Sequence, residues 1–73
     1  MIMDVMVFVT SVYNRKAVNK VQPLLTAVPA IAQWNFDLED CDHILRVVAN
    51  NLSPRSVESL LQSVWFDCRE LEY

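Results

Sequence analysis

The sequence contains no glycine and only one histidine. Loops that cradle phosphates in nucleotide-binding proteins need glycine, because its backbone can approach the ligand closely. A single histidine, with no serine–histidine–aspartate set that local spacing suggests, leaves no candidate for nucleophilic catalysis. We therefore expect a protein that is not an enzyme and that holds no cofactor.

Basic residues and long apolar segments are also scarce. Six lysines and arginines stand against nine acidic residues, and the net charge is −3. Nucleic acids and anionic membrane surfaces both attract Lys and Arg, so we expect neither as a partner. No run approaches the roughly 20 apolar residues of a membrane-spanning helix. Residues 1–10 include Asp4 and lack the basic start and cleavage site of a signal peptide, which predicts a cytoplasmic location.

The hydrophobic pattern predicts two helices and four strands within one domain, residues 1–73. Pro23 lies inside the first helix, where it removes one backbone hydrogen bond and introduces a kink. Ser53 followed by Pro54 is typical of a helix start. The last strand breaks strict alternation, so it is expected to be short or bulged. The predicted strands are residues 5–10, 30–39, 43–49 and 66–73, and the predicted helices are 15–28 and 54–64.

This order of elements, β-α-β-β-α-β, predicts an α+β fold of the ferredoxin-like type. Its compact solution is a four-stranded antiparallel sheet of order 4-1-3-2 with both helices on one face. If Met6 and Phe8 face the helices, five apolar residues fall on the open face of the sheet. Reversing the parity of the first strand would place Met6 and Phe8 there instead. The five residues are Val5, Val7, Val9, Ile44 and Val48.

Three segments, residues 18–29, 34–39 and 52–66, resemble the heavy-metal-associated (HMA) domain family in order and spacing. Copper chaperones and the metal-binding modules of metal-pumping ATPases belong to that family. The resemblance covers nearly the whole chain. It implies the fold predicted above and a metal-binding loop before the first helix.

The family's M-x-C-x-x-C motif is degenerate in this chain, where it aligns with the segment that starts at Val12. In the family, two thiolates of this motif bind a soft ion such as Cu(I). Asn14 and Ala17 replace the two cysteines, and Arg15 and Lys16 add positive charge between them. We therefore expect that this loop carries no metal ion.

Cys41, His43 and Cys68 form the alternative set of metal ligands. The topology places the turn that holds Cys41 and the start of the last strand at the same end of the sheet as the degenerate loop. Their spacing matches no known zinc motif. The competing interpretation is a solvated acidic turn, with Asp40 and Asp42 beside Cys41, and a half-buried Cys68. Without an export signal, both thiols are expected to be reduced.

Two hypotheses of function follow. The first is a non-enzymatic binding module with an HMA-like fold that has lost its metal site. It would form a homodimer or bind a protein partner through the apolar residues of the open sheet face. Trp65, where the family has glycine, either fills space beneath the loop or contacts the partner. The alternative is a copper or zinc chaperone or sensor that uses a non-standard site.

Overall fold

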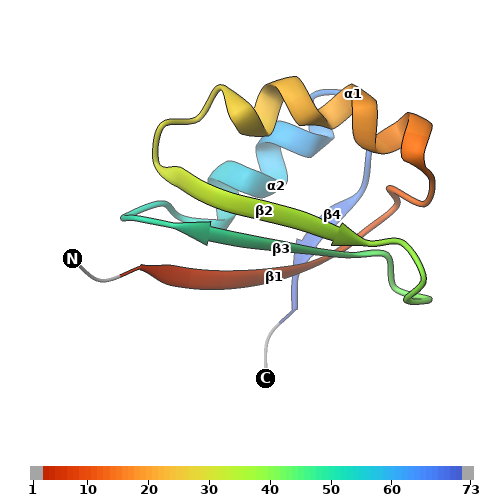
Figure 1. The fold of residues 1–73 in the computed structure, drawn as a ribbon, viewed down its shortest axis with the longest axis horizontal. Helices are drawn as coiled ribbons and strands as arrows, with labels where there is room; N and C mark the ends of the chain where they lie inside the picture. The colour runs from red at the N-terminus through yellow and green to blue at the C-terminus, as the bar shows by residue number, and fades with distance from the viewer. Residues whose placement is uncertain (1–2, 72–73) are drawn as a thin grey trace.

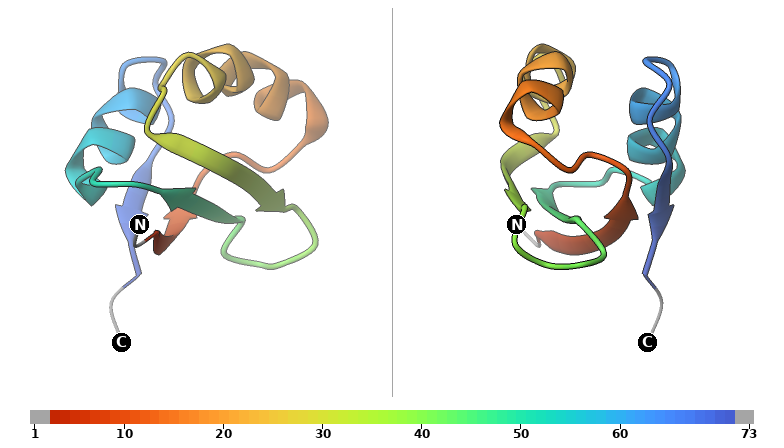
Figure 2. Two further views of the ribbon diagram at one scale, coloured as in Figure 1. Left: turned by 60° about the vertical axis from the view of Figure 1, so that its left-hand side comes forward. Right: turned by 90° about the vertical axis from the view of Figure 1, so that its right-hand side faces the viewer.

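The computed structural model describes residues 3–71. Its elements follow the predicted order, and the sheet has the order β2-β3-β1-β4 with antiparallel neighbours (Figure 1). Both helices lie on the same side of the sheet (Figure 2). The predicted ferredoxin-like fold is therefore confirmed. The elements are β1 (Asp4–Thr10), α1 (Arg15–Thr26), β2 (Ile31–Asp37), β3 (Ile44–Ala49), α2 (Pro54–Gln62) and β4 (Cys68–Glu70).

Side-chain caps begin both helices. Asn14 is the N-cap of α1 and Ser53 is the N-cap of α2, and each side chain accepts a hydrogen bond from a backbone N–H of the first turn. Pro23 lies within α1, which continues past it to Thr26 as one helix. Both helix starts were therefore predictable from short local patterns.

Three strands are shorter than the hydrophobic pattern predicts, β3 by one residue and β2 and β4 by more. β2 ends at Asp37, because its side-chain Oδ1 accepts a hydrogen bond from the backbone N–H of Glu39 and so begins a turn. β4 contains three residues, which confirms the expectation of a short last strand. The end of the predicted strand, residues 72 and 73, lies outside the described residues.

The core lies between the sheet and the two helices, and it decides the parity of β1, for which the sequence left two alternatives. Met6 and Phe8 are buried there, as are their cross-strand neighbours Val47 and Leu45. Trp34 pairs with Phe36 edge-to-face at 5.9 Å between ring centroids, at the margin of the core beside α1. The side chains of alternate residues on β1 and β3 therefore point to the uncovered face.

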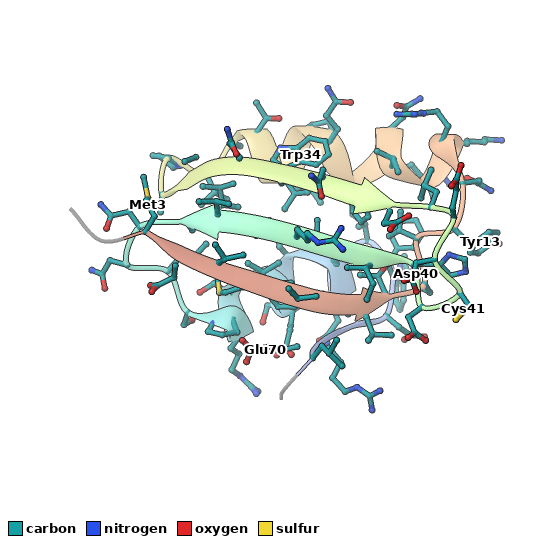
Figure 3. All side chains as sticks on the ribbon, turned by 60° about the horizontal axis from the view of Figure 1, so that its bottom comes forward. Met3, Tyr13, Trp34, Asp40, Cys41 and Glu70 are labelled. Atoms are coloured by element: carbon teal, nitrogen blue, oxygen red, sulfur yellow. The ribbon has the colours of Figure 1, made fainter. Side chains whose placement is uncertain are left out.

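The open face of the sheet is less apolar than the sequence predicts (Figure 3). Val5 is 66% exposed, but Ile44 is only 6% exposed and offers little surface. Val7 and Val9 are half-buried, and the register places Arg46 directly beside Val7 on the same face. A charged side chain therefore interrupts the predicted patch near its centre.

Candidate functional site at the loop end

Three loops meet at one end of the sheet, and hydrogen bonds join them. The backbone N–H of Ser11 donates to the carbonyl of Asp67 at 3.1 Å, and the N–H of Asp67 donates back to Ser11 Oγ at 2.8 Å. The N–H of Thr10 donates to the carbonyl of Asp42 at 3.3 Å. We call this region the loop end; it comprises residues 11–14, 38–43 and 63–67.

Thr10 holds the first two of these loops together from a buried position. Its Oγ1 donates a hydrogen bond to the backbone carbonyl of His43 at 2.6 Å and accepts one from the N–H of Val12 at 3.1 Å. Both capacities of a buried hydroxyl are therefore satisfied. The sequence pattern did not single out this residue, because a threonine at the end of a strand has no distinctive signature.

The degenerate motif is built into the fold at the start of α1. Asn14 Oδ1 accepts a hydrogen bond from the N–H of Ala17 at 2.8 Å. Ala17 and Val12 are buried in the core, whereas Arg15 and Lys16 are exposed. Each position that the family's motif gives to cysteine thus has a structural role, one as a helix cap and the other as a core residue. Neither side chain offers a thiolate.

His43 lies against the same loop. Its ring centroid is 6.0 Å from that of Tyr13, and the ring planes are inclined by 50°. The backbone of His43 has a φ of 48°, in the left-handed region. Its Nδ1 is buried and has no hydrogen-bond partner among residues 3–71. The imidazole therefore packs on Tyr13 of the β1–α1 loop.

Cys41 lies in an exposed turn with two carboxylates, and Figure 3 shows it beside Asp40 and near Tyr13. The ligand atoms of Asp40, Cys41 and Asp42 all lie within 4.8 Å of one another. This is the one such group in the described part of the chain, and it contains neither His43 nor Cys68. Zn²⁺ accepts both thiolate and carboxylate ligands, so these three residues could hold that ion.

Cys68 does not join this group of ligands, because its side chain is buried in the core. It pairs with Thr10 across β1 and β4, and it is 5% exposed. Burial, with a smaller contribution from the Glu58 carboxylate, raises the pKa of the thiol to about 12. A thiol with so high a pKa forms the thiolate far less readily than an ordinary cysteine, which makes Cys68 a poorer metal ligand and nucleophile.

Trp65 is the most exposed large apolar residue in residues 3–71, with 95% of its surface accessible. It follows α2 with a φ of 70°, the left-handed conformation that glycine adopts most readily. Its N–H donates to the carbonyl of Gln62, and the N–H of Phe66 donates to the carbonyl of Leu61. These two bonds form a Schellman motif, which usually has glycine at this position. Trp65 is therefore exposed and does not fill the space beneath the loop.

The known structures that this chain resembles share its whole architecture. Oxidised MerP from Ralstonia metallidurans CH34 superposes with a TM-score of 0.82 at 7% identity, over 97% of this chain and 100% of its own. The HMA domain of the copper chaperone for superoxide dismutase, in its apo form, gives 0.80 at 18% identity, over 97% and 69%. The chain has the fold of an HMA domain.

A third HMA-like structure, the yeast copper transporter domain CCC2A solved in apo and Cu(I)-loaded states, gives a TM-score of 0.79 at 16% identity, over 93% of this chain and 94% of its own. No family model matches the sequence, and no curated protein is significantly similar to it. At these identities the likeness shows the fold alone. Neither helix within the described residues is long and apolar enough to cross a bilayer.

In this HMA fold, Tyr13 is the exposed residue of the loop end that the sequence reasoning passed over. It lies within the degenerate motif and is 63% exposed. Because Ser11 and Asp67 are joined by two hydrogen bonds, Tyr13 and Trp65 belong to adjoining loops. The signal available in the sequence was an aromatic residue between Val12 and Asn14, which replace the methionine and the first cysteine of the motif.

Proposed function

We propose that this chain is a non-enzymatic interaction module that contacts a protein partner through its loop end. The observation that carries the proposal is Trp65, an almost fully exposed tryptophan held in a conformation that favours glycine. Such a residue stabilises neither the core nor the helix end, so local stability does not account for it. Tryptophan and tyrosine are the residues most often found at the energetic centres of protein interfaces.

The replaced motif supports the same proposal. Asn14 is engaged as a helix cap and Ala17 is buried, so the loop presents backbone, Tyr13 and two basic side chains instead of two thiolates. Acidic side chains of the other two loops, Asp42 and Asp67, are exposed nearby. A surface with an aromatic anchor among charges of both signs suits a polar, partly apolar protein surface.

Site-specific photocrosslinking tests this proposal. A photoreactive phenylalanine analogue is placed at position 65 and, as a matched control, at exposed Arg55 near the opposite end of α2. We expect a discrete adduct from position 65 that Arg55 does not give, and we expect Trp65→Gly to weaken binding of the purified partner. Identical adducts from both positions would contradict the proposal.

A second candidate function, metal binding, is favoured by the structural neighbours. The yeast domain was solved with Cu(I), and the ligand atoms of Asp40, Cys41 and Asp42 lie within 4.8 Å of one another. The metal ion would be carried by the turn at residues 40–42, and not by the loop before α1 that binds metal in the family. The metals bound by the structural neighbours favour this candidate. The replacement of both motif cysteines by Asn14 and Ala17 favours the first candidate.

Titration of the reduced protein with Zn²⁺ or Cu(I) against a competing chelator distinguishes the two candidates. The metal candidate requires binding that Cys41→Ser removes and Cys68→Ser leaves in place, because only Cys41 is exposed. Binding that survives Cys41→Ser would exclude this turn as the site. The photocrosslinking result does not depend on the titration.

A further inference from the structure

The two edges of the sheet differ in how well their backbone is protected. β4 is a three-residue edge, and the N–H of Glu70 that points away from the sheet donates to Glu58 Oε2 of α2 at 2.8 Å. β2 is a seven-residue edge. An exposed row of backbone groups on such an edge can pair with another strand.

The register identifies the backbone groups of β2 that point away from the sheet. The N–H of Leu71 donates to the carbonyl of Val7, so odd-numbered residues of β1 pair with β4 and even-numbered residues pair with β3. Continued through β3, this alternation directs Gln33 and Asn35 toward β3. Within the regular part of β2 the outward residues are Trp34 and Phe36, and no loop, cap or side-chain hydrogen bond in residues 3–71 uses their N–H groups.

β2 also lacks the features that usually protect an edge. It contains no lysine and no proline, and Asp37 at its end is its one charged residue. Its register irregularity lies at the start, between Ile31 and Gln33, and includes Ala32, whereas the pairing from Gln33 to Asp37 is regular. Natural edges of this length are normally blocked by charges, proline or a covering segment.

We propose that β2 pairs with β2 of a second copy of this chain, antiparallel and centred on Trp34. In this register the Trp34 residues of the two copies face each other, and Phe36 falls opposite Ala32 in the irregular start of the other copy's β2. The central Trp34 pair joins two outward-facing residues, which can exchange two ladder hydrogen bonds. The two four-stranded sheets become one continuous sheet, with the helices of both copies on the same side.

The side chains and charges fit a second copy. Arg15, Val18 and Gln22 of α1, with Trp34 and Phe36, line a hollow of about 240 Å³ beside the edge. A second copy would cover the exposed parts of these aromatic rings. The two-fold symmetry carries Asp37 and Arg15 of the two copies to opposite ends, so like charges do not face each other. On the open face, Gln33 meets Asn35 of the other copy, and their amides can hydrogen-bond.

A charge-swap pair of variants tests both the dimer and its register by sedimentation equilibrium, over a concentration series with reductant to keep Cys41 reduced. Gln33→Glu/Asn35→Glu places carboxylates opposite each other twice, and we expect the dissociation constant to rise about tenfold or more. Gln33→Lys/Asn35→Glu places opposite charges at the same pairs and should preserve the dimer. Both residues are exposed, so the monomer should fold in each variant, which circular dichroism checks.

Three results would overturn the proposal. The first is a wild-type chain that stays monomeric up to millimolar concentration. The second is a dimer whose dissociation constant is the same in both charge variants. The third is a dimer lost in Val7→Lys, because Val7 lies on the open sheet face and would mark that face as the interface. Trp65→Gly should leave the dimer unchanged, which separates this inference from the proposed function.

Discussion

The start of α1 and the end of α2 both lie at the loop end, and both depart from the HMA pattern that the chain resembles. At the start of α1, Asn14 caps the helix and Ala17 packs in the core, so the replacements of the two cysteines serve the fold. At the end of α2, Trp65 replaces a glycine, keeps the left-handed conformation and remains 95% exposed. The first departure adds local stability, and the second reduces it.

This difference separates two reasons for a residue to be present. A helix cap and a buried alanine are explained by contacts within the chain. An exposed tryptophan in a left-handed conformation costs about 1–2 kcal/mol relative to an ordinary backbone and makes no compensating contact in the core. Contacts within the chain do not explain this residue, and this is the reason for placing the proposed partner contact at the end of α2.

The largest effect should come from restoring the two cysteines. Asn14→Cys/Ala17→Cys, made in a Cys41→Ser background, should bind Cu(I) by two thiolates, seen as a new ultraviolet charge-transfer absorption and retention against a chelator. Thiols at a helix N-terminus ionise easily, which favours the metal-bound form. The Cys41→Ser protein alone is the control. If the double variant folds and binds no more Cu(I) than the control, the loop has lost more than its ligands.

The two native cysteines should differ in their rates of alkylation, because Cys68 is buried and Cys41 is exposed. The raised pKa of Cys68 should slow its alkylation at pH 8 about a thousandfold relative to an ordinary thiol, because the thiolate is the reacting form. Exposed Cys41 should react quickly. Mass spectrometry after timed alkylation measures both rates, and equal rates would show that Cys68 is accessible.

The same pKa makes stability depend on alkaline pH. The folded chain holds the Cys68 proton more tightly than the unfolded chain, whose thiol ionises near its ordinary value of 9.0. The contribution is therefore complete below pH 9 and is lost as the pH rises toward 12. Urea unfolding of the wild type and Cys68→Ala across this range should show a smaller loss in the variant.

Removing the cap of α1 tests whether the residue that replaces the first cysteine stabilises the fold. Asn14→Ala should lower the free energy of unfolding by about 1 kcal/mol, because the N–H of Ala17 loses its acceptor. Asn14→Ser, which keeps a capping oxygen, is the matched control and should lose less. If the wild type and the two Asn14 variants were equally stable in urea unfolding, the start of α1 would not differ from the end of α2 in its contribution to stability.

The smallest effect, and one of opposite sign, is expected at the end of α2. Trp65→Gly should raise the free energy of unfolding by roughly 0.5–1 kcal/mol, because glycine relieves the left-handed conformation at the cost of greater freedom in the unfolded chain. Trp65→Ala keeps the conformational cost and should not be stabilised. A destabilised glycine variant would mean that Trp65 makes stabilising contacts within the chain.

Much of the fold was predictable because its signals are local. The alternation that ends near Asp37 and the Ser53–Pro54 helix start are read from neighbouring residues. The parity of β1 is different: its residues are apolar on both faces, and only the burial of Met6 and Phe8 decides it. The boundaries were less predictable: β2 ends at Asp37 because that side chain starts a turn, and Leu38 and Glu39 leave the strand. The pattern of apolar residues does not show where a side-chain hydrogen bond starts a turn and so ends a strand.

The loop end was less predictable, because its arrangement depends on contacts between distant segments. Cys41 and Cys68 both belong to elements that approach the degenerate loop, yet one is exposed and the other is buried in the core. Ile44 has the parity of the open face and is nonetheless buried. Exposure depends on what packs over each side chain, and the spacing of residues does not show that.

The sequence by itself determined the order of the elements, the absence of a thiolate pair in the loop and the replacement of a glycine by Trp65, since each depends only on which residue stands where. Only the tertiary structure decided that Ala17 is buried in the core, that Trp65 is exposed, and that Glu58 closes one edge of the sheet while β2 remains open. The physical reason is that burial and backbone pairing are made between segments far apart in the chain.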